Sequence, residues 1–179
     1  MRPPEDCDLC PLSEGRTNIV MPHGDTGSGI VFVGEAPGEK EDLLGIPFVG
    51  RAGKILDGYM EEEGLQRSRV VITNTVKCRP PGNRDPTEEE MKACRRFLDS
   101  ELSRARLVIG LGKSACKNLL GYEGKMADIV NKRTVITVNG KEIPFIPTYH
   151  PSACIYNKNA RTVLKETIRT VREELETLE

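Results

Sequence analysis

The feature that most constrains the fold is a short apolar run that ends in a glycine-rich turn. The run at residues 29–33 reads GIVFV, and the turn at residues 34–38 reads GEAPG. A β-branched and aromatic run without polar alternation is typical of a strand buried on both faces of a parallel sheet. The turn then follows the carboxyl end of that strand, where open α/β sheets bind ligands. Taken alone, it is better interpreted as an ordinary strand-to-helix connection.

The rest of the chain supplies further strands and helices of the same kind. We predict strands at residues 30–33, 69–73, 106–111, 134–138 and 143–146, with a shorter one at residues 18–21. The sequence Asn139-Gly140 between the last two strands is the favoured two-residue hairpin turn. Helices are predicted at residues 53–63, 87–103, 113–120 and 159–178. This alternation of strands and helices indicates the α/β class.

Length and charge limit the class of protein. The 179 residues, 37% of them hydrophobic, predict a single domain over residues 1–179. There is no apolar run near the ~20 residues of a membrane helix, and the N-terminus lacks the apolar core of a signal peptide. We therefore expect a cytoplasmic protein with no membrane partner. A monomer is also expected. The net charge of −1 argues against a global basic field for nucleic acid but leaves local binding open.

Four side chains are suited to binding a planar polar ligand. Three of them lie at or just beyond the ends of predicted strands, and the fourth is an aromatic residue in a loop. Asn74 can be a turn former, but its amide also offers an acceptor and a donor side by side, which match an imide edge such as that of uracil. Phe48 fills the core, the commoner case, or presents its ring for stacking. Because parallel strands end at one edge of a sheet, Glu35, Asn74 and His150 should meet there.

Four of the six cysteines form a candidate metal site. Disulfides are disfavoured in a reducing compartment, so metal binding or catalysis is the better starting hypothesis. Cys7 and Cys10 share a Cys-x-x-Cys turn, while Cys78 and Cys94 follow a strand and lie on a helix. Such a centre would staple the N-terminal segment to the domain. Four thiolates suit zinc and iron–sulfur clusters equally, and a plain buried role is an alternative for Cys78 and Cys94.

Over nearly its whole length the chain resembles the family 4, iron–sulfur-containing uracil-DNA glycosylases. The motifs that carry the resemblance, in the family's order, are Cys7-x-x-Cys10, Gly34-Glu-Ala-Pro-Gly38, Pro47-Phe-Val-Gly-Arg51, Thr73-Asn74 through Lys77-Cys-Arg-Pro-Pro81, Cys94 and His150-Pro-Ser152. The resemblance implies a three-layer α/β/α sandwich with a central four-stranded parallel sheet. It also implies that Cys7, Cys10, Cys78 and Cys94 bind a 4Fe-4S iron–sulfur cluster.

The implied activity is that of a monofunctional DNA glycosylase in base excision repair. Such an enzyme flips uracil out of DNA, hydrolyses its N-glycosidic bond and leaves an abasic site. By resemblance, Phe48 stacks on uracil, the Asn74 amide pairs with N3–H and O4, and His150 donates a hydrogen bond to O2. Gly34, Glu35 and Ala36 are also expected to line the uracil site.

Two positions depart from the wider glycosylase superfamily. Ala36 stands where other branches carry a water-activating Asp, so we expect Glu35, or alternatively Asp42, to supply the catalytic carboxylate. Gly38 stands where other branches exclude thymine with a Tyr, so we expect Glu41 to exclude the methyl group.

The expected partner is uracil-containing DNA, single- or double-stranded, with a sliding clamp as a candidate partner protein. The predicted DNA-contacting residues, cationic side chains and one apolar wedge, are Arg51, Lys77, Arg79, Arg84 and Ile155. One alternative is a non-catalytic uracil-DNA-binding or damage-sensing protein. Another is an iron–sulfur redox protein, which would explain the cysteines but not Asn74, Phe48 and His150 at one edge.

Overall fold

The computed structural model describes residues 1–178, so residue 179, the last of the predicted domain, lies outside the described residues. The strands are β1 (His23–Gly24), β2 (Ile30–Gly34), β3 (Val71–Asn74), β4 (Leu107–Leu111), β5 (Thr134–Val138) and β6 (Lys141–Thr148). The α-helices are α1 (Glu39–Leu44), α2 (Arg51–Glu62), α3 (Glu88–Glu101), α4 (Lys113–Leu120) and α5 (Lys158–Glu176). Short 3₁₀ turns include η4 (Pro81–Asn83) and η6 (Pro151–Ile155).

All six strands form one sheet in the order β1-β3-β2-β4-β6-β5. The central strands β3, β2, β4 and β6 are parallel, whereas β1 and β5 pair antiparallel at the two edges. The α/β class with a four-stranded parallel centre is therefore confirmed, with an added antiparallel strand at each edge. The Asn139-Gly140 hairpin is also confirmed, since it joins β5 to β6.

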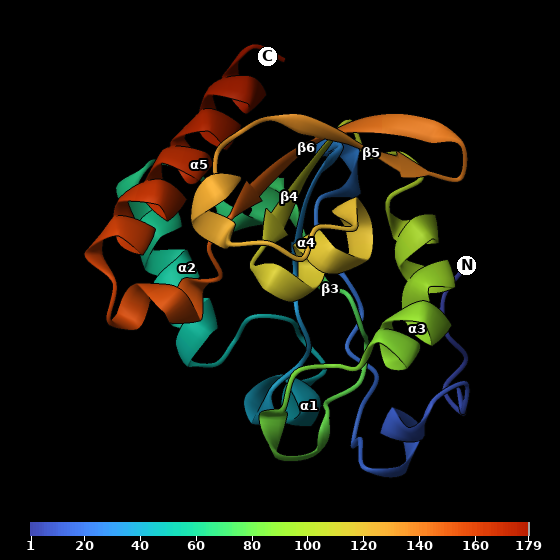
Figure 1. The fold of residues 1–179 in the computed structure, drawn as a ribbon. Coiled ribbons are helices and arrows are strands. Elements are labelled where there is room, and N and C mark those ends of the chain that lie inside the picture. The colour runs from blue at the N-terminus through green and yellow to red at the C-terminus, as the bar shows by residue number, and fades with distance from the viewer. Residues whose placement is uncertain (179) are drawn as a thin grey trace.

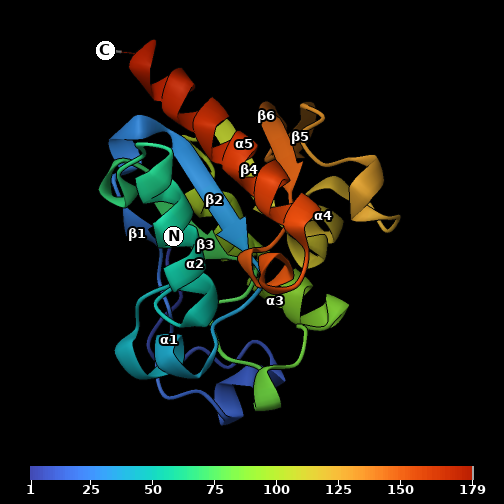
Figure 2. The same cartoon turned by 90° about the vertical axis from the view of Figure 1, so that its left-hand side faces the viewer.

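Helices cover both faces of the sheet and make three layers (Figures 1 and 2). Ile30 and Phe32 of β2 pack with the side chains of α2 and α5. Val31 and Val33 pack on the opposite face with those of α3 and α4. Burial on both faces explains why β2 lacks polar alternation.

The short strand predicted at residues 18–21 is wrong. The strand found in this region is β1, which starts at His23 and pairs with Ile72 and Val71 of β3. Its two residues are exposed and carry no hydrophobic pattern, so pairing with β3 alone defines them. Within residues 1–178, no helix has the length and apolar character needed to cross a membrane.

Candidate active site

The carboxyl ends of the parallel strands bring the predicted residues together. In the register of β2 and β3, Gly34 lies opposite Asn74. The loop after β6 carries His150, whose ring centroid lies 5.6 Å from that of Phe48. Gly112, which follows β4, packs so closely that an added Cβ would lie 2.9 Å from the His150 Cβ. The expected meeting of strand ends at one edge is thus found in the structure.

The most informative atom of the site is the amide oxygen of Asn74. Asn74 is 3% exposed, and its Oδ1 is buried without a hydrogen-bond partner among the described residues. Leaving such an acceptor unpaired costs about 1–3 kcal/mol, so native proteins rarely retain one without a function. The backbone below it is fixed, because the buried Lys77 ammonium donates to the Asn74 carbonyl over 2.7 Å. Asn74 therefore presents a fixed acceptor suited to a ligand N–H.

Phe48 sits against this amide in a strained backbone conformation. Its φ is +53°, in the left-handed region that non-glycine residues avoid, and the residue is 5% exposed. Glu41 accepts from the Val49 and Gly50 amides at 2.8 and 2.6 Å, while Arg67 donates to the carbonyls of Phe48 and Pro47. The loop is thus held from both sides, as expected where backbone strain serves a binding site.

Gly34 leaves the space that brings Phe48 and Asn74 together. A Cβ at this position would lie 2.4 Å from Phe48 Cζ and 2.6 Å from Asn74 Oδ1. We expect Gly34→Ala to displace both groups and lower the rate of base release by about 100-fold, the effect of a misplacement of about 1 Å. Gly58→Ala is the matched control, because an added Cβ there meets nothing within 4 Å. Equal rates for both variants in a single-turnover assay would contradict this role.

The His150 ring is oriented as a neutral hydrogen-bond donor. Its Nδ1 accepts from the Ser152 amide at 3.2 Å and lies 2.8 Å from Ser152 Oγ. Burial lowers the pKa of His150 to about 4, a shift that the nearby Asp85 carboxylate opposes. The imidazole is therefore neutral at pH 7, and with Nδ1 accepting, its proton resides on Nε2.

The Glu35 carboxyl is half-buried and oriented from α4. Ser114 Oγ donates to Glu35 Oε2 over 2.7 Å. Burial raises the pKa of Glu35, the Ser114 hydrogen bond lowers it, and the neighbouring Asp85 raises it. Ala36, the next residue of the turn, has no functional group, so Glu35 is the carboxyl that this turn offers to the site.

Asp42 has a different place from the one predicted. The residue is 3% exposed, and its Oδ1 accepts from the backbone amides of Thr17 and Asn18 at 2.8 and 3.1 Å. These contacts brace the N-terminal segment against α1, so the predicted catalytic role of Asp42 is corrected to a structural one. Glu41 is occupied by backbone amides as described above, and its role in excluding the thymine methyl group stays a prediction.

A DNA contact by Lys77 is also wrong. The side chain is 1% exposed, and its Nζ lies 2.6 Å from both Glu101 Oε1 and Thr73 Oγ1. A cation so enclosed cannot reach a phosphate. Lys77 instead ties the strand end that carries Asn74 to α3.

The other predicted DNA-contacting residues lie nearer the surface. Arg51 is exposed at the start of α2, and Arg79 is half-buried and donates to Asn83 Oδ1 over 2.7 Å. Arg84 forms two 2.8 Å hydrogen bonds to the Glu90 carboxylate. Ile155 is half-buried in η6, whereas the following Tyr156 is 91% exposed. The more protruding apolar side chain at the predicted wedge is therefore Tyr156.

The four predicted metal ligands surround one small cavity. Cys7, Cys10, Cys78 and Cys94 all line it, in a largely apolar setting. Arg16 links the segment to the domain, because its Nη1 donates to the Cys7 carbonyl at 2.7 Å and lies 3.6 Å from Cys78 Sγ. Burial raises the pKa of Cys94 to about 11, and a bound metal centre would favour its thiolate form.

This donor set fits an iron–sulfur cluster, which thiolates bind in a protected, weakly solvated site. Among residues 1–178 there is no group of three or more His, Cys, Asp or Glu side chains that could hold a metal ion. The four cysteines thus line one cavity, but their side chains are not grouped closely enough to hold a single metal ion.

Sequence reasoning missed two contributors to the site. Arg67, 19 residues beyond Phe48, clamps the loop through two carbonyls. Asp85 reaches Glu35 and His150 from the loop before α3. Neither has a local signal, because each acts on a segment that is distant in the sequence.

Comparisons with known proteins agree with this site. The family model of the uracil DNA glycosylase superfamily matches residues 21–173. The type-4 uracil-DNA glycosylase of Sulfurisphaera tokodaii is 43% identical over 93% of this chain and 79% of its own. That of Thermotoga maritima is 42% identical over 95% of this chain and 86% of its own. The type-5 enzyme of Pyrobaculum aerophilum is more distant, at 31% identity over 82% and 65%. The chain therefore belongs to the uracil-DNA glycosylase superfamily and, within it, to the type-4 uracil-DNA glycosylases.

Proposed function

We propose that this protein is a uracil-DNA glycosylase that hydrolyses the N-glycosidic bond of flipped-out uracil and leaves an abasic site. The observation that carries the proposal is that the Oδ1 of Asn74, beside the Phe48 ring, is buried and has no hydrogen-bond partner in the described part of the chain. Uracil presents an N3–H donor next to the O4 acceptor, which is the complement of a side-chain amide. Cytosine presents the opposite pattern, so a fixed Asn74 rejects it.

The chemical step needs stabilisation of a uracil anion and delivery of water. As the bond from N1 to C1′ breaks, its electron pair passes to uracil and negative charge develops on O2. The Nε2–H of neutral His150 is the donor assigned to that charge, and a preorganised donor of this kind contributes about 3–4 kcal/mol. Glu35, held by Ser114, is assigned to orient the attacking water and to oppose the positive charge of the sugar.

A 4Fe-4S cluster held by Cys7, Cys10, Cys78 and Cys94 is part of the proposal. The support is their shared cavity and the raised pKa of the half-buried Cys94 thiol. Through metal–thiolate bonds, Cys7 and Cys10 would be joined to Cys78 in the segment after β3 and to Cys94 of α3, which would fasten the N-terminal segment to the domain. Lys77 lines the same cavity as Cys78 and Cys94 and donates to the Asn74 carbonyl, so the proposed cluster site adjoins the strand end that carries Asn74.

The proposed substrate is uracil-containing DNA. Arg51, Arg79 and Arg84 are proposed to contact its phosphates, and Ile155 of η6 is proposed to contact the base stack. A sliding-clamp partner, a monomeric state, a cytoplasmic location and the single-domain organisation stay predictions from the sequence.

The proposal is tested by single-turnover release of base from matched oligonucleotides containing one uracil, cytosine or thymine. We expect free uracil and alkali-labile abasic sites from the uracil strand alone. Tight binding of uracil-DNA without release of uracil would favour the damage-sensing alternative and overturn the catalytic assignment.

A further inference from the structure

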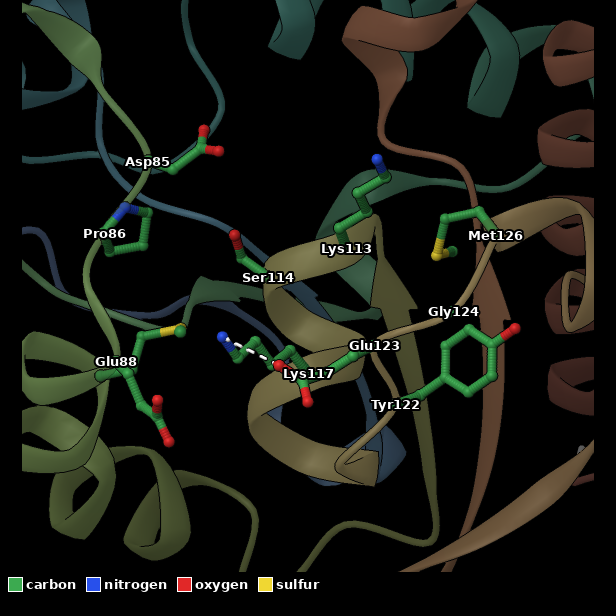
Figure 3. Close-up of a pocket in the computed structure, with 11 residues that line it drawn as sticks. Asp85, Pro86, Glu88, Lys113, Ser114, Lys117, Tyr122, Glu123, Gly124 and Met126 are labelled. Atoms are coloured by element: carbon green, nitrogen blue, oxygen red, sulfur yellow. Dashed lines mark ion pairs between the residues drawn. The ribbon is translucent and has the colours of Figure 1, made fainter.

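Asp85, which no sequence motif assigns to the reaction, lines a pocket that adjoins Glu35 through Ser114. It follows η4 in the loop that leads to α3, and with Ser114 it lines a pocket of about 300 Å³. Figure 3 shows the Asp85 carboxylate on the loop that faces Lys113 and Ser114 at the start of α4. Since Ser114 also donates to Glu35 at 2.7 Å, this pocket adjoins the catalytic carboxyl.

The Asp85 side chain interacts with both groups assigned to the chemical step. Asp85 shares its pocket with Ser114, the hydrogen-bond donor to Glu35. Beyond the effect of burial, Asp85 raises the pKa of Glu35 through its charge and a side-chain hydrogen bond. The same charge acts on the His150 ring. Two carboxyl groups in such contact form a hydrogen bond only when they share a proton. Asp85 is the exposed member of the pair, whereas Glu35 is half-buried and fixed by Ser114.

We propose that Asp85 and Glu35 form a carboxyl pair that activates the attacking water, with Asp85 as the member that passes the proton to solvent. The bond from C1′ to N1 breaks with its electrons on uracil, and the water oxygen bonds to C1′. The proton lost by that water goes to the pair and then through exposed Asp85 to bulk water. Uracil leaves as an anion and takes a proton from solvent.

This inference rests on the proposed function and explains how the site works without a carboxylate at Ala36. The second carboxyl, Asp85, comes from a loop 50 residues after Glu35 in the chain and lines the same pocket as Ser114. The groups that face Glu35 are Ser114 from α4 and Asp85 from that loop. Because Asp85 raises the pKa of Glu35, removing its charge must lower that pKa.

The test compares Asp85→Asn with Glu88→Gln as the matched control. Glu88 lines the same pocket and is exposed, but it pairs with Lys92. We expect Asp85→Asn to slow single-turnover uracil release about 100-fold, within the usual range for loss of a general base. We also expect the acidic limb of its pH–rate profile to move to lower pH, while Asp85→Glu restores much of the rate. Glu88→Gln should change neither quantity.

A double variant separates a carboxyl pair from two independent groups. If the two act as one unit, Glu35→Gln combined with Asp85→Asn is no slower than the slower single variant. Multiplied rate losses, or an Asp85→Asn rate and pH profile within twofold of the wild type, would overturn the proposal. Wild-type protein assayed in parallel shows whether uracil release itself occurs, so failure of the proposed function is recognised separately.

Discussion

We expect Asn74→Ala to lower kcat/KM for uracil release by about 10²–10³-fold. The substitution removes an acceptor for N3–H and a donor for O4, each in a site closed to water. A buried hydrogen bond of this kind contributes about 1–3 kcal/mol, and each 1.4 kcal/mol corresponds to a factor of ten. Single-turnover kinetics with a uracil oligonucleotide measure the effect.

The same variant should fold as well as the wild type. Among residues 1–178 the Asn74 Oδ1 has no hydrogen-bond partner, so its removal breaks no hydrogen bond there and relieves a buried acceptor. We expect the free energy of unfolding to stay within about 1 kcal/mol of the wild-type value, as measured by denaturant titration. Asn159→Ala, at an exposed position in the first turn of α5, is the control that should change neither quantity. Full activity of Asn74→Ala would remove the central support for uracil recognition.

The parallel centre of the fold could be predicted because its local patterns and its tertiary environment agree. The strands β2 and β4 are apolar on both faces, and a capping box from Thr87 to Glu90 starts α3 beside the predicted helix start at residue 87. Edge strand β1 has no such pattern, and it exists because His23 and Gly24 lie beside β3. Local sequence thus predicts a strand whose own residues carry a burial pattern. It does not predict a strand that is defined only by pairing with a neighbouring strand.

The errors at the site have a related cause. Lysine side chains are almost never fully buried, so the sequence favoured a surface position for Lys77. Its partner Glu101 lies 24 residues away on α3, and only the packing of α3 against β3 reveals the pair. Asp85 was missed for the same reason, since its contact with Glu35 depends on how the loop after η4 crosses the strand ends.

We expect His150→Ala to lower kcat by about 10²–10³-fold with little change in binding of uracil-DNA. The loss corresponds to the about 3–4 kcal/mol of a preorganised donor that acts on charge formed in the transition state. His150→Gln retains a side-chain N–H and should recover part of the rate. A rate for His150→Ala within threefold of the wild type would contradict the assignment of this donor.

The charge state of His150 gives this assignment a direct test by pH. With a pKa of about 4 in the folded protein and about 6.5 in the unfolded chain, the native state excludes a proton that the unfolded state takes up between these values. The stabilising contribution is therefore fully present above about pH 6.5 and is lost as the pH falls towards about 4. Protonation would also place an N–H on Nδ1, opposite the donating Ser152 amide, and so disturb the oriented ring. His150→Gln should lose less stability than the wild type between pH 7 and pH 4. In an NMR titration His23 provides the only other imidazole signal. A His150 midpoint near 6.5 instead of about 4 would contradict a half-buried, neutral donor.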